Sequence, residues 1–189
     1  MKHIVKNTAI LLAIALIATA ALAFVYELTK EPIAQAQAKK KAEAYQDVYT
    51  TAGNFAEVAN SAAILKEFNS KRTDGSSVEE VLAAQDVAGE TLGYVMSVNS
   101  TKGYGGGIRL ALGVDKSGKV VGYAVLEHGE SPGFGANCVN ADVREQFIGI
   151  TAADQVEGIS GATITTNALR AETQAAIDLV KSMGGEGAW

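Results

Sequence analysis

Residues 91–126 (TLGYVMSVNSTKGYGGGIRLALGVDKSGKVVGYAVL) contain the pattern that decides the fold. Residues 92–98 alternate in the manner of a strand, and the runs 108–114 and 119–126 also have strand composition. Asp115-Lys-Ser-Gly118, between the last two runs, is typical of a hairpin turn. We therefore expect a small antiparallel sheet.

Helical patterns lie on both sides of this region. Residues 27–50 are rich in Ala, Lys and Gln, and residues 56–68 also have helical spacing. After the sheet, residues 166–183 place several apolar side chains on one face, namely Ala168, Ala171, Ala175 and Leu179. These elements predict an α+β fold in which helices pack on the sheet.

The N-terminus has a different character. Residues 8–26 are uncharged, and a helix of that length spans roughly 28 Å, close to the hydrocarbon thickness of a bilayer. Lys2 and Lys6 precede it, so we expect a single N-terminal transmembrane helix with a cytoplasmic N-terminus. A signal peptide cleaved at Ala21-Leu22-Ala23 is the main alternative, and a buried helix of a soluble core is another.

The composition argues against several classes of function. The single Cys138 cannot form an internal disulfide or a cysteine-based cluster, and His3 and His128 lie far apart, so no metal site is expected. Residues 27–189 carry 14 basic and 21 acidic side chains, a net charge of −7. This acidity argues against nucleic acid as a partner.

A short segment before the last helix can carry chemistry. Ser160-Gly161-Ala162-Thr163 is small and polar, and a helix N-terminus after such residues offers free N–H groups to a phosphate. The hydroxyl of Thr163 could be esterified. Ordinary helix capping by the neighbouring Ser, Thr and Asn side chains is the alternative that the residues alone leave open.

Ser160-Gly161-Ala162-Thr163, followed by Ile164-Thr165, resembles the flavinylation motif of the FMN-binding domain family. That family includes the G subunit of the Rnf electron-transport complex and the C subunit of the sodium-translocating NADH:quinone oxidoreductase. The resemblance implies that Thr163 carries FMN through a phosphoester bond, installed by a flavin transferase with FAD as donor. Where the family has Asp, three residues before the Ser, this chain has Glu157, which keeps the charge and changes its reach.

Two further segments carry the resemblance. Residues 102–108 (KGYGGGI) resemble the family's glycine-and-tyrosine loop, and residues 128–135 (HGESPGFG) resemble its His-x-Glu-Thr-Pro-Gly loop, with Ser131 in place of Thr. A flavin ring needs close backbone approach, an apolar face and polar groups at one edge. Tyr104 is expected either to stack on the ring or to pack in the core. The shortness of the chain and its compact N-terminal part match the Rnf G subunit better than the quinone oxidoreductase C subunit.

The resemblance assigns cofactor-binding roles to all three segments. The expected residues are Thr163 as the covalent attachment site, with Ser160, Gly161, Ala162, Thr165, Glu157, Gly103, Tyr104, Gly105, Glu130, Ser131 and Gly133. Glu130 and Ser131 are expected to contact the polar edge of the flavin, largely through backbone; a solvated loop carboxylate is the alternative for Glu130. His128 is expected to order its loop, and no catalytic residue is assigned. Arg109 and Arg170 could face the phosphate or could be surface residues.

Four parts are expected in the chain: a transmembrane anchor (1–27), a helical membrane-proximal region (28–90), an FMN-binding domain (91–183) and a loose tail (184–189). The resemblance implies an electron-relay subunit, without substrate turnover of its own, in a membrane ferredoxin:NAD oxidoreductase that translocates sodium ions or protons. It implies the A, B, C, D and E subunits of the Rnf complex as partners, and an FMN domain on the extracytoplasmic side of the cell membrane. The alternatives are the quinone oxidoreductase C subunit, an extracellular flavinylated electron carrier, and a non-redox, membrane-anchored ligand-binding domain.

Overall fold

The computed structural model describes residues 2–184, and the chain divides into two compact units, 1–40 and 41–189. α1 (Lys2–Val48) forms the first unit and continues into the second. Of the expected tail 184–189, all but Gly184 lies outside the described residues.

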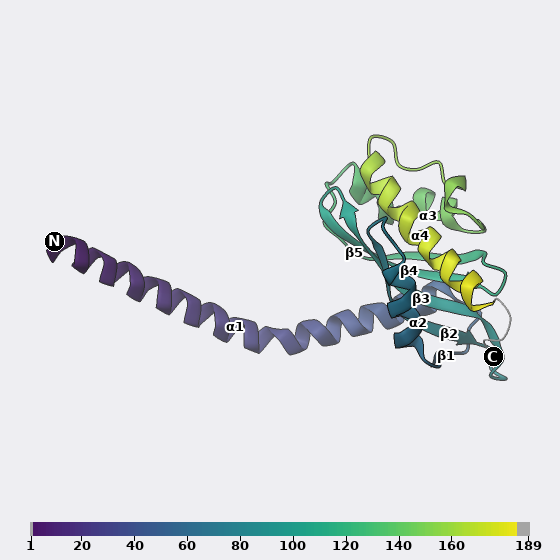
Figure 1. The fold of residues 1–189 in the computed structure, drawn as a ribbon, viewed down its shortest axis with the longest axis horizontal. Helices are drawn as coiled ribbons and strands as arrows, with labels where there is room; N and C mark the ends of the chain where they lie inside the picture. The colour runs from purple at the N-terminus through teal and green to yellow at the C-terminus, as the bar shows by residue number, and fades with distance from the viewer. Residues whose placement is uncertain (1, 185–189) are drawn as a thin grey trace. The chain divides into compact units, whose positions relative to one another are not determined.

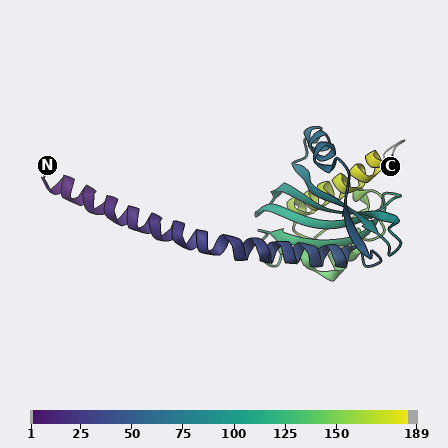
Figure 2. The ribbon, with the colours of Figure 1, turned by 90° about the horizontal axis from the view of Figure 1, so that it is seen from below.

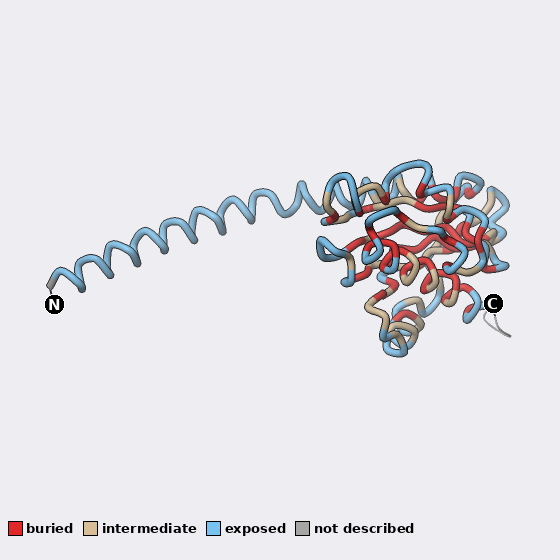
Figure 3. The backbone as a smooth tube through the Cα atoms, turned by 90° about the horizontal axis from the view of Figure 1, so that it is seen from above, coloured by how far each residue is buried: buried red, intermediate tan, exposed pale blue. Residues whose placement is uncertain are grey.

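The first unit is a helix without a protein core. Residues 3–40 are exposed throughout, and Figure 3 shows this stretch in pale blue. Figure 2 shows α1 as one long continuous helix. An 18-residue window of this helix has a mean hydropathy of 2.6, and none of that window is buried. Pro32 lies inside the helix, where it removes one backbone hydrogen bond. By length and composition, α1 can cross a membrane.

The second unit is built on one sheet of five antiparallel strands in the order β1-β2-β3-β4-β5 (Figure 1). Each strand pairs with the next along the chain, which makes a meander. The strands are β1 (Asn54–Glu57), β2 (Ser76–Gln85), β3 (Thr91–Gly103), β4 (Gly106–Asp115) and β5 (Val120–His128). The helices that follow α1 are α2 (Ser61–Ser70), α3 (Ala141–Phe147) and α4 (Thr163–Met183), with 3-10 turns η1 (Gly135–Val139) and η2 (Ala153–Gln155).

α4 covers one face of the sheet and forms the larger core with it (Figure 1). Its Leu169, Ile177 and Leu179 are fully buried, together with sheet residues such as Met96 and Leu112. Burial of each such side chain contributes about 1.5–3 kcal/mol. Apolar packing therefore fixes α4 on the sheet, and with it the residues at the helix N-terminus.

The end of α1 and the residues that follow it cover the opposite face. Tyr45, Val48 and Tyr49 are buried there with Val95 of β3. The backbone of Val48 approaches β4 so closely that a Cβ at Gly113 would lie 2.5 Å from the Val48 carbonyl oxygen. Residues 45–49 therefore belong to the core of the second unit.

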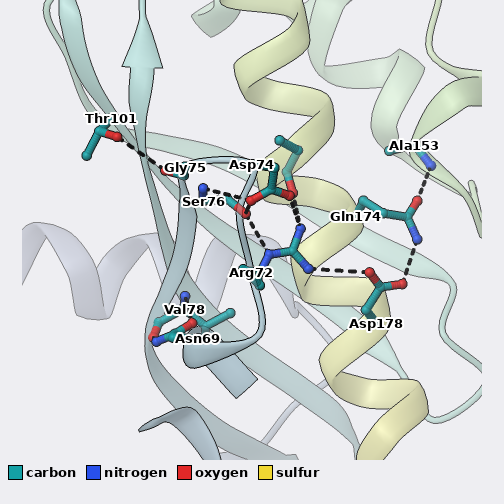
Figure 4. A network of polar contacts seen from close by, with 11 residues as sticks. Asn69, Arg72, Asp74, Gly75, Ser76, Val78, Thr101, Ala153, Gln174 and Asp178 are labelled. Atoms are coloured by element: carbon teal, nitrogen blue, oxygen red, sulfur yellow. Dashed lines mark hydrogen bonds and ion pairs between the residues drawn. The ribbon is translucent and has the colours of Figure 1, made fainter. Parts of the chain in front are cut away.

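A polar network joins the α2–β2 turn to the C-terminal half of α4 (Figure 4). Arg72 forms ion pairs with Asp74 and, at 3.4 Å, with Asp178. Gln174 donates to Asp178 (2.7 Å) and accepts from the backbone N–H of Ala153 (3.0 Å), which lies in η2. The network fixes α4 at the end opposite to Thr163 and ties down η2, which precedes the segment 156–162.

The structure confirms the predicted α+β fold. β3, β4 and β5 lie where strand patterns were expected, and Asp115 and Gly118 close the predicted hairpin with a hydrogen bond of 3.0 Å between the Gly118 N–H and the Asp115 carbonyl. The last helix begins at Thr163, three residues before the expected start at 166.

The region 28–90 differs from the expected helical region because it also contains β1 and β2. The helix expected over 56–68 begins only at Ser61. Residues 76–85 lack a regular alternation because a bulge after Val78 shifts the register against β3. Pairing with β3, and not local pattern, makes this segment a strand.

Candidate functional site

A cleft of about 490 Å³ opens where four segments of the second unit meet. Tyr104 comes from the β3–β4 turn, Glu130 and Ser131 from the segment after β5, and Phe134 and Gly135 from the start of η1. The fourth segment leads into α4 and contributes Gly161, Ala162, Thr163, Ile164 and Thr165. This volume lies in the range usual for small-molecule and cofactor sites.

The carboxylate of Glu130 joins two walls of the cleft. The side chain is buried, at 6% exposure. One of its oxygens accepts from the backbone N–H of Gly105 (3.1 Å), and the other from the hydroxyl of Thr165 (2.5 Å). The Glu130 N–H in turn donates to Nδ1 of His128 (3.3 Å). His128 therefore orders this loop, as predicted, and the solvated carboxylate considered for Glu130 is wrong.

Glycines let the cleft segments approach one another. A Cβ at Gly129 would lie 2.5 Å from the carbonyl oxygen of Gly105, and a Cβ at Gly105 would collide with the backbone of Gly129. A Cβ at Gly135 would collide with the carboxylate of Glu130 and the hydroxyl of Thr165. The walls can close to this distance only because these positions have no side chain.

Thr163 is the first residue of α4, and its side chain is exposed. No side chain caps the helix: Ala162 occupies the N-cap position without a side-chain hydrogen bond. The hydroxyl of Thr166 instead donates to the Ala162 carbonyl (3.0 Å) and accepts from the Ile159 N–H (3.0 Å), which fixes the turn before the helix. The first-turn N–H groups thus lack a side-chain cap, as suits an anion beside Thr163.

Arg170 holds the segment 156–162 against α4. Its guanidinium donates to the carbonyl of Val156 and to that of Glu157 (3.2 Å). Gly158, at a φ of +103°, donates its N–H to the side chain of Gln146 (2.9 Å). Arg170 therefore positions the Thr163-bearing turn from behind and does not line the cleft.

Seven of the expected cofactor-binding residues line the cleft: Gly161, Ala162, Thr163, Thr165, Tyr104, Glu130 and Ser131. Five do not: Ser160, Glu157, Gly103, Gly105 and Gly133. Gly105 supports the cleft from behind through its bond to Glu130. The cofactor-binding roles of all twelve residues stay predictions.

The mouth of the cleft carries exposed apolar side chains. Tyr104 is 70% exposed, so core packing, one of its two expected roles, is wrong. Phe134 (57%) and Ile164 (52%) also line the cleft, and neither was expected. The sequence offered one signal for both residues, because each is an apolar residue inside or next to a predicted cofactor-binding motif. Phe134 stands between two glycines, and Ile164 follows Thr163.

Arg109 does not face the cleft. It pairs with Glu79 (3.0 Å) and Glu127 (3.2 Å) and lines a second hollow of about 370 Å³. The hollow is polar, with Asn99 and His128 also in its lining. Among the described residues that line the main cleft, Glu130 is thus the one with a carboxyl group, and none is Lys, Arg or His.

Cys138 is buried behind the cleft in η1. Burial, reinforced by the nearby carboxyl groups of Glu130 and Glu172, raises the pKa of its thiol to about 11. The thiol is therefore protonated at neutral pH and behaves as a small apolar group.

The fold and the cleft agree with the families that match the sequence. A family described as FMN-binding domain matches residues 103–178, and one described as RnfG N-terminal region matches residues 1–48. The first match contains all four segments of the cleft, and the second contains the whole of α1. These observations define an FMN-binding domain that follows an apolar N-terminal helix.

Proteins of similar sequence identify the family of the whole chain more narrowly than the two matching families do. The G subunit of the ion-translocating oxidoreductase complex of Methanosarcina acetivorans is 30% identical over 97% of this chain and 98% of its own. The G subunit of the same description from Shewanella amazonensis is 34% identical over 71% of this chain and 61% of its own. The G subunit of the proton-translocating ferredoxin:NAD(+) oxidoreductase complex of Clostridium ljungdahlii is 33% identical over 51% and 57%. The chain belongs to the family of G subunits of ion-translocating oxidoreductase complexes.

Among solved structures, NqrC of Shewanella oneidensis is similar, with a TM-score of 0.44 at 18% identity. The match covers 72% of this chain and 74% of that chain.

Proposed function

We propose that this chain is the electron-relay subunit of a membrane ferredoxin:NAD oxidoreductase that translocates sodium ions or protons, and that it carries FMN as a phosphoester on Thr163. The observation that carries the proposal is the position of Thr163, whose exposed side chain lies on the wall of the cleft at an uncapped helix N-terminus. The FMN-binding domain match supports the cofactor, and the similarity to G subunits supports the complex.

The cleft suits a flavin in its lining. Tyr104 and Phe134 offer exposed aromatic faces to a flat ring, and a phosphate on Thr163 would meet the N–H groups of the first turn of α4. Gly161, at a φ of +74°, and Gly135 leave room for a bulky group close to the backbone. When bound, FMN supplies the redox chemistry, and these residues hold and orient it.

Attachment is a group transfer from FAD. The hydroxyl oxygen of Thr163 forms a bond to the phosphorus of the FMN half, the diphosphate bond of FAD breaks, AMP leaves, and the hydroxyl proton passes to solvent. A flavin transferase catalyses this step during maturation. Glu157 and Ser160 are exposed and lie outside the cleft lining, which supports a role for them in contacting that enzyme. The residues that line the cleft would contact the flavin.

The other subunits of the complex are the redox partners. The resemblance names the A, B, C, D and E subunits, with electrons exchanged with a covalent FMN on the D subunit and an iron–sulfur centre between the A and E subunits. α1 anchors the chain in the cell membrane, and Lys2 and Lys6 before the apolar run favour an FMN domain on the extracytoplasmic side. This chain passes electrons on and turns over no small-molecule substrate of its own.

Intact-protein mass spectrometry of the chain purified from its native membrane tests the proposal. We expect a mass increase of one FMN less one water, located on the peptide that contains Thr163, and retention of residues 1–26. Thr163→Ala should abolish the increase and leave the fold intact because the side chain is exposed. Thr163→Ser, which keeps a hydroxyl, is the matched control and should still be flavinylated.

A flavin that survives denaturation in Thr163→Ala would assign the attachment to another residue. A colourless wild-type chain of unmodified mass, purified from cells that contain the transferase, would favour a non-redox ligand-binding domain. Co-purification with quinone oxidoreductase subunits would place the chain in that other complex.

A further inference from the structure

Glu130 differs from every other residue of the cleft in being both charged and structural. Both of its carboxylate oxygens accept hydrogen bonds, from the Gly105 N–H (3.1 Å) and the Thr165 hydroxyl (2.5 Å). Two donors, one to each oxygen, match the ionised, acceptor-only form of a carboxyl group. The side chain thus ties the β3–β4 turn to α4 and brings a negative charge into the cleft.

The charge has no cation opposite it in the cleft. Among the described residues that line the cleft, none is Lys, Arg or His. Arg109 pairs with Glu79 and Glu127, and Arg170 donates to two backbone carbonyls. Because Glu130 is 6% exposed, water screens its charge far less than that of a surface carboxylate.

We propose that Glu130 is a positioning and potential-setting residue: it holds the cleft closed around the flavin, and its buried negative charge lowers the midpoint potential of the bound FMN. The inference rests on the proposed function. Two-electron reduction of FMN at pH 8 takes up two electrons and one proton, which adds one negative charge to the ring. A carboxylate in the same cleft opposes that added charge, so reduction becomes less favourable.

The variant Glu130→Gln removes the charge of the side chain and can keep its two hydrogen bonds. The carbonyl oxygen of a glutamine can accept from the Gly105 N–H, and its NH2 group can donate to the hydroxyl oxygen of Thr165, because a hydroxyl both donates and accepts. Both bonds of the original side chain can therefore be kept while the charge is lost. Glu130→Asp keeps the charge and shortens the reach.

Glu127→Gln is the matched control. Its side chain is 63% exposed, pairs with Arg109 and lies in the second hollow, so the same loss of charge occurs nearby in sequence but outside the cleft. All variants are made in the full chain, purified with their covalent flavin, and titrated electrochemically at pH 8 with optical detection of the flavin. The electrode supplies the electrons.

We expect Glu130→Gln to raise the equilibrium constant for two-electron reduction at least tenfold, a shift of about 30 mV to more positive potential. Glu130→Asp and Glu127→Gln should stay within threefold of the wild type. An unchanged potential in a fully flavinylated Glu130→Gln, or an equal shift in Glu127→Gln, overturns the inference while leaving the proposed function in place. A wild-type chain without flavin overturns both.

Thr165→Val provides a second test if circular dichroism shows that Glu130→Gln does not fold. This variant removes the donor at 2.5 Å that partly neutralises the carboxylate and keeps the charge itself. We expect a potential more negative than that of the wild type, and a potential that is unchanged or more positive overturns the inference.

Discussion

At the scale of single residues, Glu172 is the strongest departure from ordinary packing. It lies on the sheet-facing side of α4, fully buried, and neither carboxylate oxygen makes a hydrogen bond of good geometry within the described residues. Burial raises its pKa well above the usual range; the nearby Ser100 backbone opposes this only in part, and Glu79 adds to it. Burial therefore favours the protonated form of this carboxyl group in the folded state, and unfolding makes its ionisation easier.

Glu172→Gln should change how stability depends on pH. Because the folded pKa is raised, the unfolded state binds fewer protons above about pH 4.5, so the wild type loses stability as pH rises towards the folded pKa. The glutamine has no such ionisation. In urea unfolding followed by circular dichroism, we expect the two proteins to diverge from pH 4 to pH 8, by at least about 1.4 kcal/mol, which corresponds to one pKa unit. The exposed Glu145→Gln is the control, and parallel curves for wild type and Glu172→Gln would contradict the account.

Two neighbouring glycines allow an equally sharp comparison. A Cβ at Gly105 would collide with the Gly129 backbone, whereas a Cβ at Gly107 would find its nearest neighbour, an oxygen of Asn99, at an ordinary 3.6 Å. We expect Gly105→Ala to cost about 1–3 kcal/mol and to lower the covalent flavin content, because the turn that carries Tyr104 must move away from Glu130. Gly107→Ala should leave both unchanged. Urea unfolding and flavin absorbance after denaturation measure the two effects, and equal behaviour of the two variants would refute this reading.

Sequence reasoning at this scale found seven of the residues that line the cleft, but it did not predict the hydrogen bonds of the Glu130 side chain. The motifs identified Glu130, but the expectation was a contact with the flavin through backbone. The bond to Thr165 joins residues 35 positions apart, which no local pattern can indicate. Glu172 was missed for a different reason: helical spacing from Ala168 places it on the core face, and its charge argues against burial.

At the scale of elements, the position of α4 decides where Thr163 lies. The helix is held near its N-terminus by the Thr165–Glu130 bond and near its C-terminus by the ion pair of Arg72 with Asp178 (Figure 4). The predicted strands from β3 onward were recognisable because each alternates or is followed by a turn signal. β2 was not, since its bulge breaks the alternation and its buried positions become clear only beside β3.

Arg72→Met should loosen the C-terminal half of α4 without disturbing the cleft. The change leaves Asp74 and Asp178 without their cation, and we expect a loss of about 1–2 kcal/mol, less than for a fully buried pair because these side chains are 38% and 42% exposed. Thr163 and Asp178 are 15 residues apart on α4, roughly 22 Å, so the flavin content should not change. Urea unfolding gives the stability, and 1 M NaCl should shrink the difference. Arg72→Lys keeps the charge without the planar guanidinium, so its stability should lie between those of the wild type and Arg72→Met. A lower flavin content in Arg72→Met would contradict the expectation that this end of α4 does not affect the cleft.

At the scale of the whole molecule, the chain combines an apolar helix with an acidic domain. Residues 8–26 carry no charge, and residues 27–189 carry a net charge of −7. The anchor was predictable because its signal is local and long. The helix expected over residues 27–50 is also present, because α1 continues to Val48. The burial of Val48 against the sheet was not predictable, because it depends on the fold of residues far along the chain.

Labelling of introduced cysteines can test on which side of the membrane the domain lies, because the chain's own Cys138 should not react. Cys138 is fully buried, and its raised thiol pKa of about 11 keeps the reactive thiolate scarce at pH 7. Lys116→Cys places a thiol in the exposed β4–β5 turn, and His3→Cys places one before the apolar run. With a membrane-impermeant maleimide on intact cells, we expect labelling at position 116 alone, and labelling at position 3 only after permeabilisation. The unmutated chain should stay unlabelled in both conditions. Labelling of position 3 on intact cells, with position 116 protected, would reverse the orientation and place the FMN domain in the cytoplasm.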